Sequence, residues 1–348
     1  MSSLVFLEHS VRLSHTGSTR VAGSVRACYH RRPMIRRVPA LLVLVLSVVV
    51  HAESRVLIIS IDGCRPDCLL RADAPNIRQM MKEGSFTMWA TTTEAAITLP
   101  SHTSMLTGCT IAKHGMRANK DETAATQPIL VPTIFQLAKE AHISTGMAAA
   151  KSKFSIYDQP IDWAWTPEES VVQSDKVADH AIEILTQHQP RLMFIHFGWT
   201  DAVGHAKGWG SPDQITAMEE VDKQIGRVLK TLDTLGLHKD TTVIVTADHG
   251  GAALGHGGLV ASSQNIPWII TGPDVRPNVD LTRYSRAGTV RTYDTFATAC
   301  KVLDIKPPDD IDGVVVSAAF KSSDLMVDVR QPTTKPTTQP TVRASRDK

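Results

Sequence analysis

The sequence predicts an α/β fold in which helices flank a mostly parallel central sheet. Three short apolar runs rich in β-branched residues predict its strands, at residues 55–61, 192–197 and 242–247. Strands that are covered on both faces need such nearly continuous apolar runs. Segments with helical periodicity lie between these runs, and strands that alternate with helices are typical of a parallel sheet.

The helical segments show apolar residues at the spacing of one helix face. They cover residues 74–83, 131–141, 175–187 and 212–235. Pro132 suits the first turn of the second segment, because the missing N–H of proline has no helical partner there. Residues 266–271 predict one further strand with Pro267 near its start, where a proline disturbs the sheet least.

The N-terminal part of the chain has the pattern of a targeting segment. Residues 34–52 combine a basic start, a short apolar run and the small-x-small ending Val50-His51-Ala52. This is the anatomy of a cleaved signal peptide, and it predicts export to the periplasm or the cell exterior. The run is too short to span a bilayer comfortably, although a buried strand or an uncleaved anchor is the alternative. Met34 is the expected natural start, with residues 1–33 as an extension before it.

Composition places the remainder among ordinary globular domains. Residues 326–348 are rich in Thr, Pro and Gln and predict a disordered tail. Residues 53–325 are then one folded domain. The net charge of +2 and the 5% of aromatic residues argue against a nucleic-acid polymer as partner. The sequence leaves the oligomeric state open.

Cysteine usage leaves two interpretations open. The expected mature chain contains Cys64, Cys68, Cys109 and Cys300. An exported protein can form disulfides, but the pairing cannot be read from the sequence. The alternative is that these residues are buried as small apolar side chains. No pair has the CxxC spacing of a metal site.

Acidic and histidine residues follow the three predicted strands. They are Asp62 after the first, Asp201 and His205 after the second, and Asp248, His249 and the more distant His256 after the third. The carboxyl ends of parallel strands meet at one rim of the sheet. Taken singly, each residue is typical of a helix cap or a paired polar group. Together, three converging carboxylates repel one another unless a cation lies among them. Oxygen and imidazole ligands suit zinc, with manganese as the second choice.

Thr98 is the candidate nucleophile. It precedes Leu-Pro-Ser-His and an apolar helical pattern, which places it near a helix N-terminus. Helix N-termini favour anions, because their N–H groups lack partners and the helix dipole is positive there. A threonine hydroxyl is a weak nucleophile until a metal ion binds its oxygen. The alternative is a helix N-cap.

These motifs, in this order, resemble the alkaline phosphatase superfamily, and within it the type I phosphodiesterase/nucleotide pyrophosphatase family. The resemblance covers residues 55–320 and rests on six segments: Ile61-Asp62-Gly63, Thr98-Leu99-Pro100-Ser101-His102, Thr107-Gly108, His114-Gly115, Asp201-Ala-Val-Gly-His205 and Asp248-His249-Gly250. It implies a hydrolase of small phosphate esters with two zinc ions. One would be held by Asp62, Thr98, Asp248 and His249, and the other by Asp201, His205 and His256. It also implies that Asn119 contacts a phosphate oxygen, whereas the alternative is a turn asparagine.

The resemblance implies a two-step hydrolysis. Thr98 attacks the phosphorus of a phosphodiester or pyrophosphate and forms a covalent phospho-enzyme. Water activated at the metal held by Asp201, His205 and His256 then releases the product. The metals and Asn119 stabilise charge on the phosphoryl oxygens.

Two departures from the family pattern keep other activities open. His256 follows Asp248 closely, so the segment that the family inserts there is absent, and the leaving-group specificity stays open. The Thr-x-Pro-Ser-His motif also resembles a sulfatase motif, but Thr98 cannot become the formylglycine that sulfatases need.

Lys151 and Lys153 resemble a stretch of phosphonoacetate hydrolases whose lysines face the substrate carboxylate; the alternative is ordinary surface charge. The rival functions are therefore a phosphonoacetate hydrolase or phosphomonoesterase on the same site, and a non-catalytic exported metal-binding protein. Three other histidines are expected outside the ligand set: His102 and His114 as structural residues or supports of ligands, and His196 as a core residue.

Overall fold

The computed structural model describes residues 53–171, 173–283 and 290–323. The expected N-terminal extension, the signal peptide and the tail lie outside the described residues. Within these ranges, no helix has both the length and the apolar character that crossing a membrane requires.

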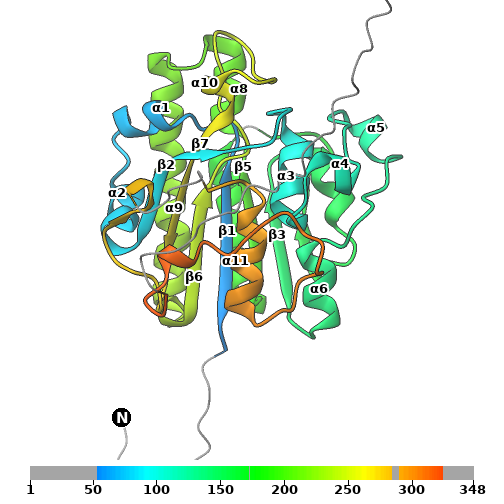
Figure 1. Cartoon of the computed structure of the whole chain (residues 1–348). Coiled ribbons are helices and arrows are strands. Elements are labelled where there is room, and N and C mark those ends of the chain that lie inside the picture. Colours follow the sequence, from blue (N-terminus) through cyan, green and yellow to red (C-terminus); the bar gives the residue numbers. More distant parts are fainter. Residues whose placement is uncertain (1–52, 172, 284–289, 324–348) are drawn as a thin grey trace, which may run out of the picture. The chain divides into compact units, whose positions relative to one another are not determined.

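The described residues contain one mixed sheet of eight strands in the order β4-β3-β5-β1-β6-β7-β2-β8 (Figure 1). Its strands are β1 Arg55–Ile61, β2 Ser85–Thr91, β3 Thr145–Ala149, β4 Trp163–Trp165, β5 Leu192–Phe197, β6 Thr241–Thr246, β7 Asn265–Thr271 and β8 Val279–Asp280. β1 pairs in parallel with β5 and β6, whereas β7 is antiparallel to both of its neighbours. The predicted α/β class with a mostly parallel sheet is confirmed.

Helices cover both faces of the sheet. One layer packs around the long α9 and contains α1 Pro66–Arg71, α2 Pro75–Glu83, α7 Ser174–His188, α8 Trp199–Lys207 and α9 Pro212–Thr234. The other contains α3 Thr98–Thr107, α4 Ile111–His114, α6 Ile134–Glu140 and α11 Asp294–Leu303. Short elements are α5 Asp121–Ala124, α10 Ala261–Gln264, and the 3₁₀ turns η1 Ser152–Tyr157, η2 His238–Asp240, η3 Leu281–Arg283 and η4 Ser317–Ala319. Alternate residues of β1 enter the two cores: Leu57 and Ile59 enter one, Val56 and Ile58 the other. This is why β1 needs an unbroken apolar run.

Most predicted elements lie within a residue or two of their expected bounds, but one helix begins later. The segment predicted from residue 131 is α6, which starts at Ile134. Thr133 is its N-cap: its Oγ1 accepts from the Gln136 N–H at 3.3 Å, and the Gln136 side chain accepts from the Thr133 N–H at 2.7 Å. This capping box fixes the helix start. Pro132 therefore lies before the helix and not in its first turn.

Pro267 lies in an interior strand, between β6 and β2, and not at an edge. The β2–β7 register shifts there, so that Met88 and Trp89 both lie opposite Pro267. Such a bulge interrupts the hydrogen-bond ladder where proline has no N–H to donate.

All four described cysteines, Cys64, Cys68, Cys109 and Cys300, are buried free thiols. The interpretation of buried small apolar side chains is confirmed for them.

Candidate active site

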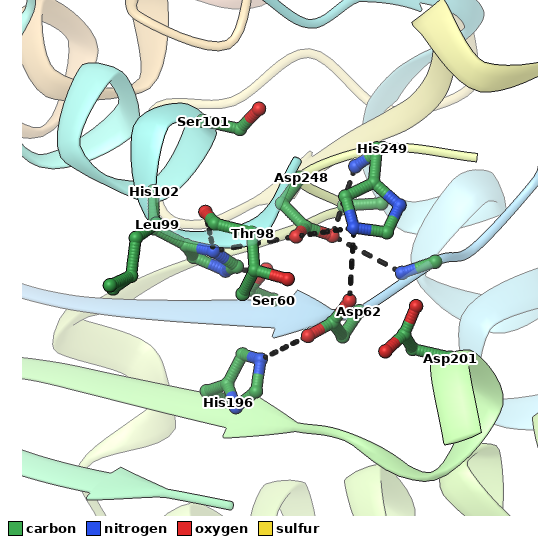
Figure 2. A network of polar contacts seen from close by, with 12 residues as sticks. Ser60, Asp62, Thr98, Leu99, Ser101, His102, His196, Asp201, Asp248 and His249 are labelled. Atoms are coloured by element: carbon green, nitrogen blue, oxygen red, sulfur yellow. Dashed lines mark hydrogen bonds and ion pairs between the residues drawn. The ribbon is translucent and has the colours of Figure 1, made fainter. Parts of the chain in front are cut away.

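The candidate ligands converge at the rim where β5, β1 and β6 end. Asp62 directly follows β1, and Asp248 lies two residues beyond β6. α8 begins two residues after β5 and carries Asp201 and His205 at i and i+4, which places them on one helix face. Figure 2 shows Asp62, Asp201, Asp248 and His249 turned toward one region beside Thr98.

The first ligand set surrounds the ring of His249. Its Nε2 lies 3.3 Å from Asp62 Oδ1 and 3.2 Å from Asp248 Oδ2. All three side chains are fully buried. Burial lowers the pKa of His249 to about 4, which favours the neutral, metal-binding imidazole.

The second ligand set surrounds Asp201. Its Oδ1 lies 3.5 Å from His205 Nε2 and 3.6 Å from His256 Nε2. The rings of His249 and His256 stack with centroids 3.7 Å apart, so the two sets adjoin. Asp201 also lies close enough to Asp62 and His249 to share an ion with them. The glycine-rich loop after His249 thus returns His256 to the site, as the sequence predicts.

Backbone carbonyl groups fix the tautomer of all three histidines. His249 Nδ1 donates to the Gly250 oxygen at 2.9 Å, and His256 Nδ1 donates to the Ala96 oxygen at 2.9 Å. His205 Nδ1 donates to the Leu254 oxygen at 3.0 Å. A carbonyl oxygen only accepts, so each Nδ1 carries the proton. Each Nε2 therefore presents a lone pair to the carboxylates, which is the arrangement of metal-binding histidines.

Several buried atoms at this point have no hydrogen-bond partner. They are Asp62 Oδ1, Asp201 Oδ1, Asp248 Oδ2 and His249 Nε2. Each unpaired buried polar atom costs about 1–3 kcal/mol. Divalent cations bound among them would satisfy these atoms, and their donor types suit zinc or manganese. The residues present therefore fit metal ions.

Lys151 contacts one oxygen atom of each of two carboxylates and leaves the other oxygen free. Its Nζ lies 2.5 Å from Asp62 Oδ2 and 2.7 Å from Asp201 Oδ2. The Oδ1 atom of each carboxylate stays free on the side of the histidines. Burial opposes the charge of this ammonium, but Asp62 and Asp201 outweigh it and raise the pKa of Lys151.

The two fully buried carboxyl groups have opposite pKa shifts. Burial opposes ionisation of Asp62, but Lys151 and the hydrogen bond from His196 outweigh it and hold its pKa well below the usual range. Burial and then the negative charge of Asp62 raise the pKa of Asp248 well above its usual range. One extra positive charge in the site would relieve this conflict.

Thr98 is the first residue of α3, and its side chain is buried beside the ligands. Its Oγ1 lies 3.4 Å from Lys151 Nζ. The N-cap position belongs to Ile97, which makes no side-chain cap. The predicted helix N-terminus is confirmed, and Thr98 is not its cap.

Asn119 and Lys153 lie together at the same helix end. Asn119 Oδ1 accepts from the Leu99 N–H at 3.0 Å, and Lys153 Nζ lies 2.8 Å from the main-chain oxygen of Asn119. Asn119 therefore contacts the residue next to Thr98, and Lys153 contacts Asn119.

His196 does more than fill the core, although it is fully buried as expected. The Ala150 N–H donates to the His196 main-chain oxygen at 3.1 Å and also to His196 Nδ1 at 3.3 Å, so the ring proton is on Nε2, which donates to Asp62 Oδ2 at 3.0 Å (Figure 2). The strand register could have indicated this role, because it pairs His196 with Ser60, two residues before Asp62.

His102 and His114 make structural contacts, as the sequence suggests. His102 Nδ1 donates to Thr98 O at 2.8 Å and its Nε2 accepts from Ser60 Oγ at 2.8 Å, so it ties α3 to β1. His114 Nε2 contacts Ser104 Oγ at 2.9 Å and its Nδ1 accepts from the Met116 N–H.

This fold and ligand set define a member of the alkaline phosphatase superfamily. The family model described as type I phosphodiesterase / nucleotide pyrophosphatase matches residues 56–262, and the chain belongs to this family. The superfamily and the family that the sequence motifs predict are both confirmed.

Curated relatives share part of their length with this chain. Bis(5'-adenosyl)-triphosphatase enpp4 of Xenopus laevis is 28% identical over 57% of this chain and 47% of the relative. Ectonucleotide pyrophosphatase/phosphodiesterase family member 5 of Homo sapiens is 26% identical over 57% of this chain and 45% of the relative. The chain therefore spans about half the length of the curated relatives it matches.

Solved structures confirm the fold. Murine ectonucleotide pyrophosphatase / phosphodiesterase 5, an inactive variant in complex with AMP, superposes with a TM-score of 0.62 at 18% identity over 74% of this chain and 96% of that chain. A 2-O GAG sulfatase gives a TM-score of 0.62 at 15% identity over 78% of this chain and 75% of that chain.

Proposed function

We propose that this protein is a metal-dependent hydrolase that cleaves phosphodiester or nucleotide pyrophosphate bonds through Thr98. The observation that carries the proposal is the position of Thr98 at a helix N-terminus, beside two adjoining Asp/His sets with unpaired buried atoms. Membership of the family supports the reaction class, and the names of the relatives support small nucleotide substrates.

Two zinc ions are the proposed cofactors, with manganese as the second choice. Asp62, Thr98, Asp248 and His249 would hold one ion, and Asp201, His205 and His256 the other. Bound there, such ions supply Lewis-acid chemistry that polarises phosphoryl oxygens and neutralises charge developing at phosphorus.

The residues of the chain perform the rest of the reaction. Thr98 loses its hydroxyl proton to solvent and its Oγ1 attacks the phosphorus; the P–O bond to the leaving group breaks and that oxygen departs with the electron pair, which gives a phosphothreonine. The Lys151 ammonium, 3.4 Å from this oxygen, favours its anionic form. The N-terminus of α3 stabilises the phosphoryl group, and Asn119 donates to one of its oxygens. Water then attacks the phosphorus, and the P–O bond to Thr98 breaks and restores the hydroxyl.

Hydrolysis of matched nitrophenyl esters tests this function. Zinc-loaded full-chain protein is assayed on bis-p-nitrophenyl phosphate, p-nitrophenyl phosphate, p-nitrophenyl sulfate and diadenosine triphosphate. We expect diester and dinucleotide turnover that stops with a chelator and is lost in Thr98→Ala, while Thr98→Ser keeps part of it. Turnover of the monoester or sulfate alone would refute the proposal in favour of a phosphomonoesterase or sulfatase-like enzyme. No turnover with two metals bound would favour a non-catalytic metal-binding protein.

A carboxylate-bearing phosphonate is the second candidate substrate. The ammonium groups of Lys151 and Lys153 both lie close to Thr98 or its supporting Asn119, and paired ammonium groups suit a substrate carboxylate. Phosphonoacetate hydrolysis that is abolished in the Lys151→Ala/Lys153→Ala double variant, with diester turnover only reduced, would support it.

We also propose that residues 53–325 form the catalytic domain and that residues 34–52 direct its export. Fractionation and N-terminal sequencing of the expressed protein test both points. A mature protein that starts at Glu53 outside the cytoplasm is expected. A protein that retains residues 1–33 would contradict the start at Met34.

A further inference from the structure

The amide of Asn119 is held by donors on one side only. Its Oδ1 accepts from the Leu99 N–H at 3.0 Å and from Lys153 Nζ at 3.3 Å. A main-chain N–H and an ammonium cannot accept hydrogen bonds. The atom that faces them must therefore be the amide oxygen, and the NH₂ group must face away.

This orientation leaves a pair of donors without a partner. In the described ranges of the chain, the structure gives Asn119 Nδ2 no acceptor. The amide adjoins the first turn of α3, where Leu99 directly follows Thr98. An NH₂ group fixed there suits a phosphoryl oxygen attached to Thr98 Oγ1.

Lys153 contributes the second fixing point. Its ammonium donates to the main-chain oxygen of Asn119 at 2.8 Å as well as to the side-chain Oδ1, so it bridges both oxygens of one residue. The Leu99 N–H alone would leave the amide free to rock about a single hydrogen bond. Lys153 lies in η1, which follows Lys151 shortly after the end of β3. Its contact with Asn119 therefore connects the segment after β3 with the start of α3.

We infer that Lys153 is a positioning residue that acts through Asn119 and does not contact the substrate. By bridging the two oxygens of Asn119, it directs the NH₂ group toward a substrate phosphoryl oxygen. The inference rests on the proposed function, and it assigns Lys153 a role different from the substrate contact expected from the sequence. Lys151, whose ammonium reaches Thr98 Oγ1, stays a direct contact to the reacting group.

A double-mutant cycle between Lys153 and Asn119 tests this assignment. Zinc-loaded wild type, Lys153→Met, Asn119→Ala and the double variant are compared for kcat/KM on bis-p-nitrophenyl phosphate. Lys153→Met should lose about tenfold and Asn119→Ala about a hundredfold, the lower range for one lost transition-state donor. In the Asn119→Ala background, Lys153→Met should cause no further loss. Independent losses that multiply in the double variant would overturn the inference, as would an unchanged Lys153→Met.

Two further variants separate positioning from folding. Asn119→Asp keeps an acceptor for Leu99 and Lys153 but has no N–H and adds a negative charge that repels the phosphoryl group, so it should lose at least as much activity as Asn119→Ala. Lys153→Arg should recover most of the activity, because a guanidinium can donate to both oxygens. Lys176→Met on α7 replaces an exposed lysine and should leave both activity and melting temperature unchanged.

Binding of orthovanadate gives a readout that does not depend on turnover. Calorimetric titration of the same zinc-loaded variants should show the same non-additive pattern. If the wild type hydrolyses no ester, the proposed function fails, and the vanadate cycle still decides the role of Lys153. Additive losses in vanadate affinity would overturn that role on their own.

Discussion

The ammonium of Lys151 lies 2.7 Å from the Oδ2 atom of Asp201 and leaves the Oδ1 atom of that carboxylate on the side of His205 and His256. The same ammonium holds Asp62 in the same way. One lysine thus connects a carboxylate of each ligand set through the oxygens that do not face the histidines. Its charge also competes with metal ions for the same carboxylates.

Replacing Lys151 should have opposite effects on metal-free stability and on metal affinity. Lys151→Met leaves two buried carboxylates without a cation, so the metal-free protein should lose about 3 kcal/mol of unfolding free energy. Zinc should then bind at least about tenfold more tightly, because no ammonium competes with it. Denaturation in chelator and competition with a chromophoric chelator measure the two effects. Lys176→Met is the matched control, and equal stability and affinity in Lys151→Met would contradict the prediction.

His196 should support metal binding through Asp62 without being a ligand. His196→Phe fits a similar volume but removes the Nε2–H that orients Asp62 Oδ2. Loss of such an outer hydrogen bond typically lowers metal affinity by about 10–100-fold. Zinc titration of the folded variant checks this value. The control is His114→Phe, which disturbs another buried histidine and should lower stability without changing zinc affinity. A His196→Phe variant with wild-type affinity would argue against the support role.

The convergence of the candidate ligands could be predicted from the sequence because Asp62, Asp201 and Asp248 each come within four residues of the end of a continuous apolar strand. Parallel strands such as β1, β5 and β6 place such residues at one rim whatever the details of packing. The sequence does not predict β3, because Thr-Gly-Met-Ala-Ala has one β-branched residue among small residues and a methionine, unlike a typical strand. Close packing around β3 leaves no room for a larger residue at Gly146, because a Cβ there would lie 2.7 Å from the Met193 sulfur and 3.0 Å from Ile184.

The roles of Lys151 and Lys153 depend on that same strand. β3 pairs with β5 and sets Ala149 beside His196, which delivers the following residues to Asp62 and Asn119. Local sequence carries no information about such a pairing, so a lysine in this stretch has the same pattern as a surface charge. Tertiary placement alone separates the two roles.

The pH dependence of the metal-free protein should follow its buried histidines. Burial lowers the pKa of His114 to about 4, whereas an unfolded histidine titrates near 6.5. The unfolded chain therefore binds more protons between these values, and stability falls as the pH falls from about 6.5 toward 4. Above about pH 6.5 this contribution is fully present. Chemical denaturation of chelator-treated protein at several pH values measures it. His114→Gln should flatten the curve over this range, and an unchanged slope would contradict the assignment.

Removing one ligand from each set should remove one metal ion at a time. His249 belongs to the set with Asp62 and Asp248, whereas His256 belongs to the set with Asp201 and His205. We expect two zinc ions per wild-type chain and one in either His249→Ala or His256→Ala, because each set loses an imidazole that no neighbour can replace. Metal analysis after dialysis gives the stoichiometry. The control is His238→Ala, which alters a histidine that is paired with Asp233 and precedes the start of β6, whereas Asp248 and His249 follow its end. Loss of both ions in each single variant would contradict this prediction. It would show that the two sets bind metal as one unit, because Asp201 lies close enough to ligands of both sets to couple them.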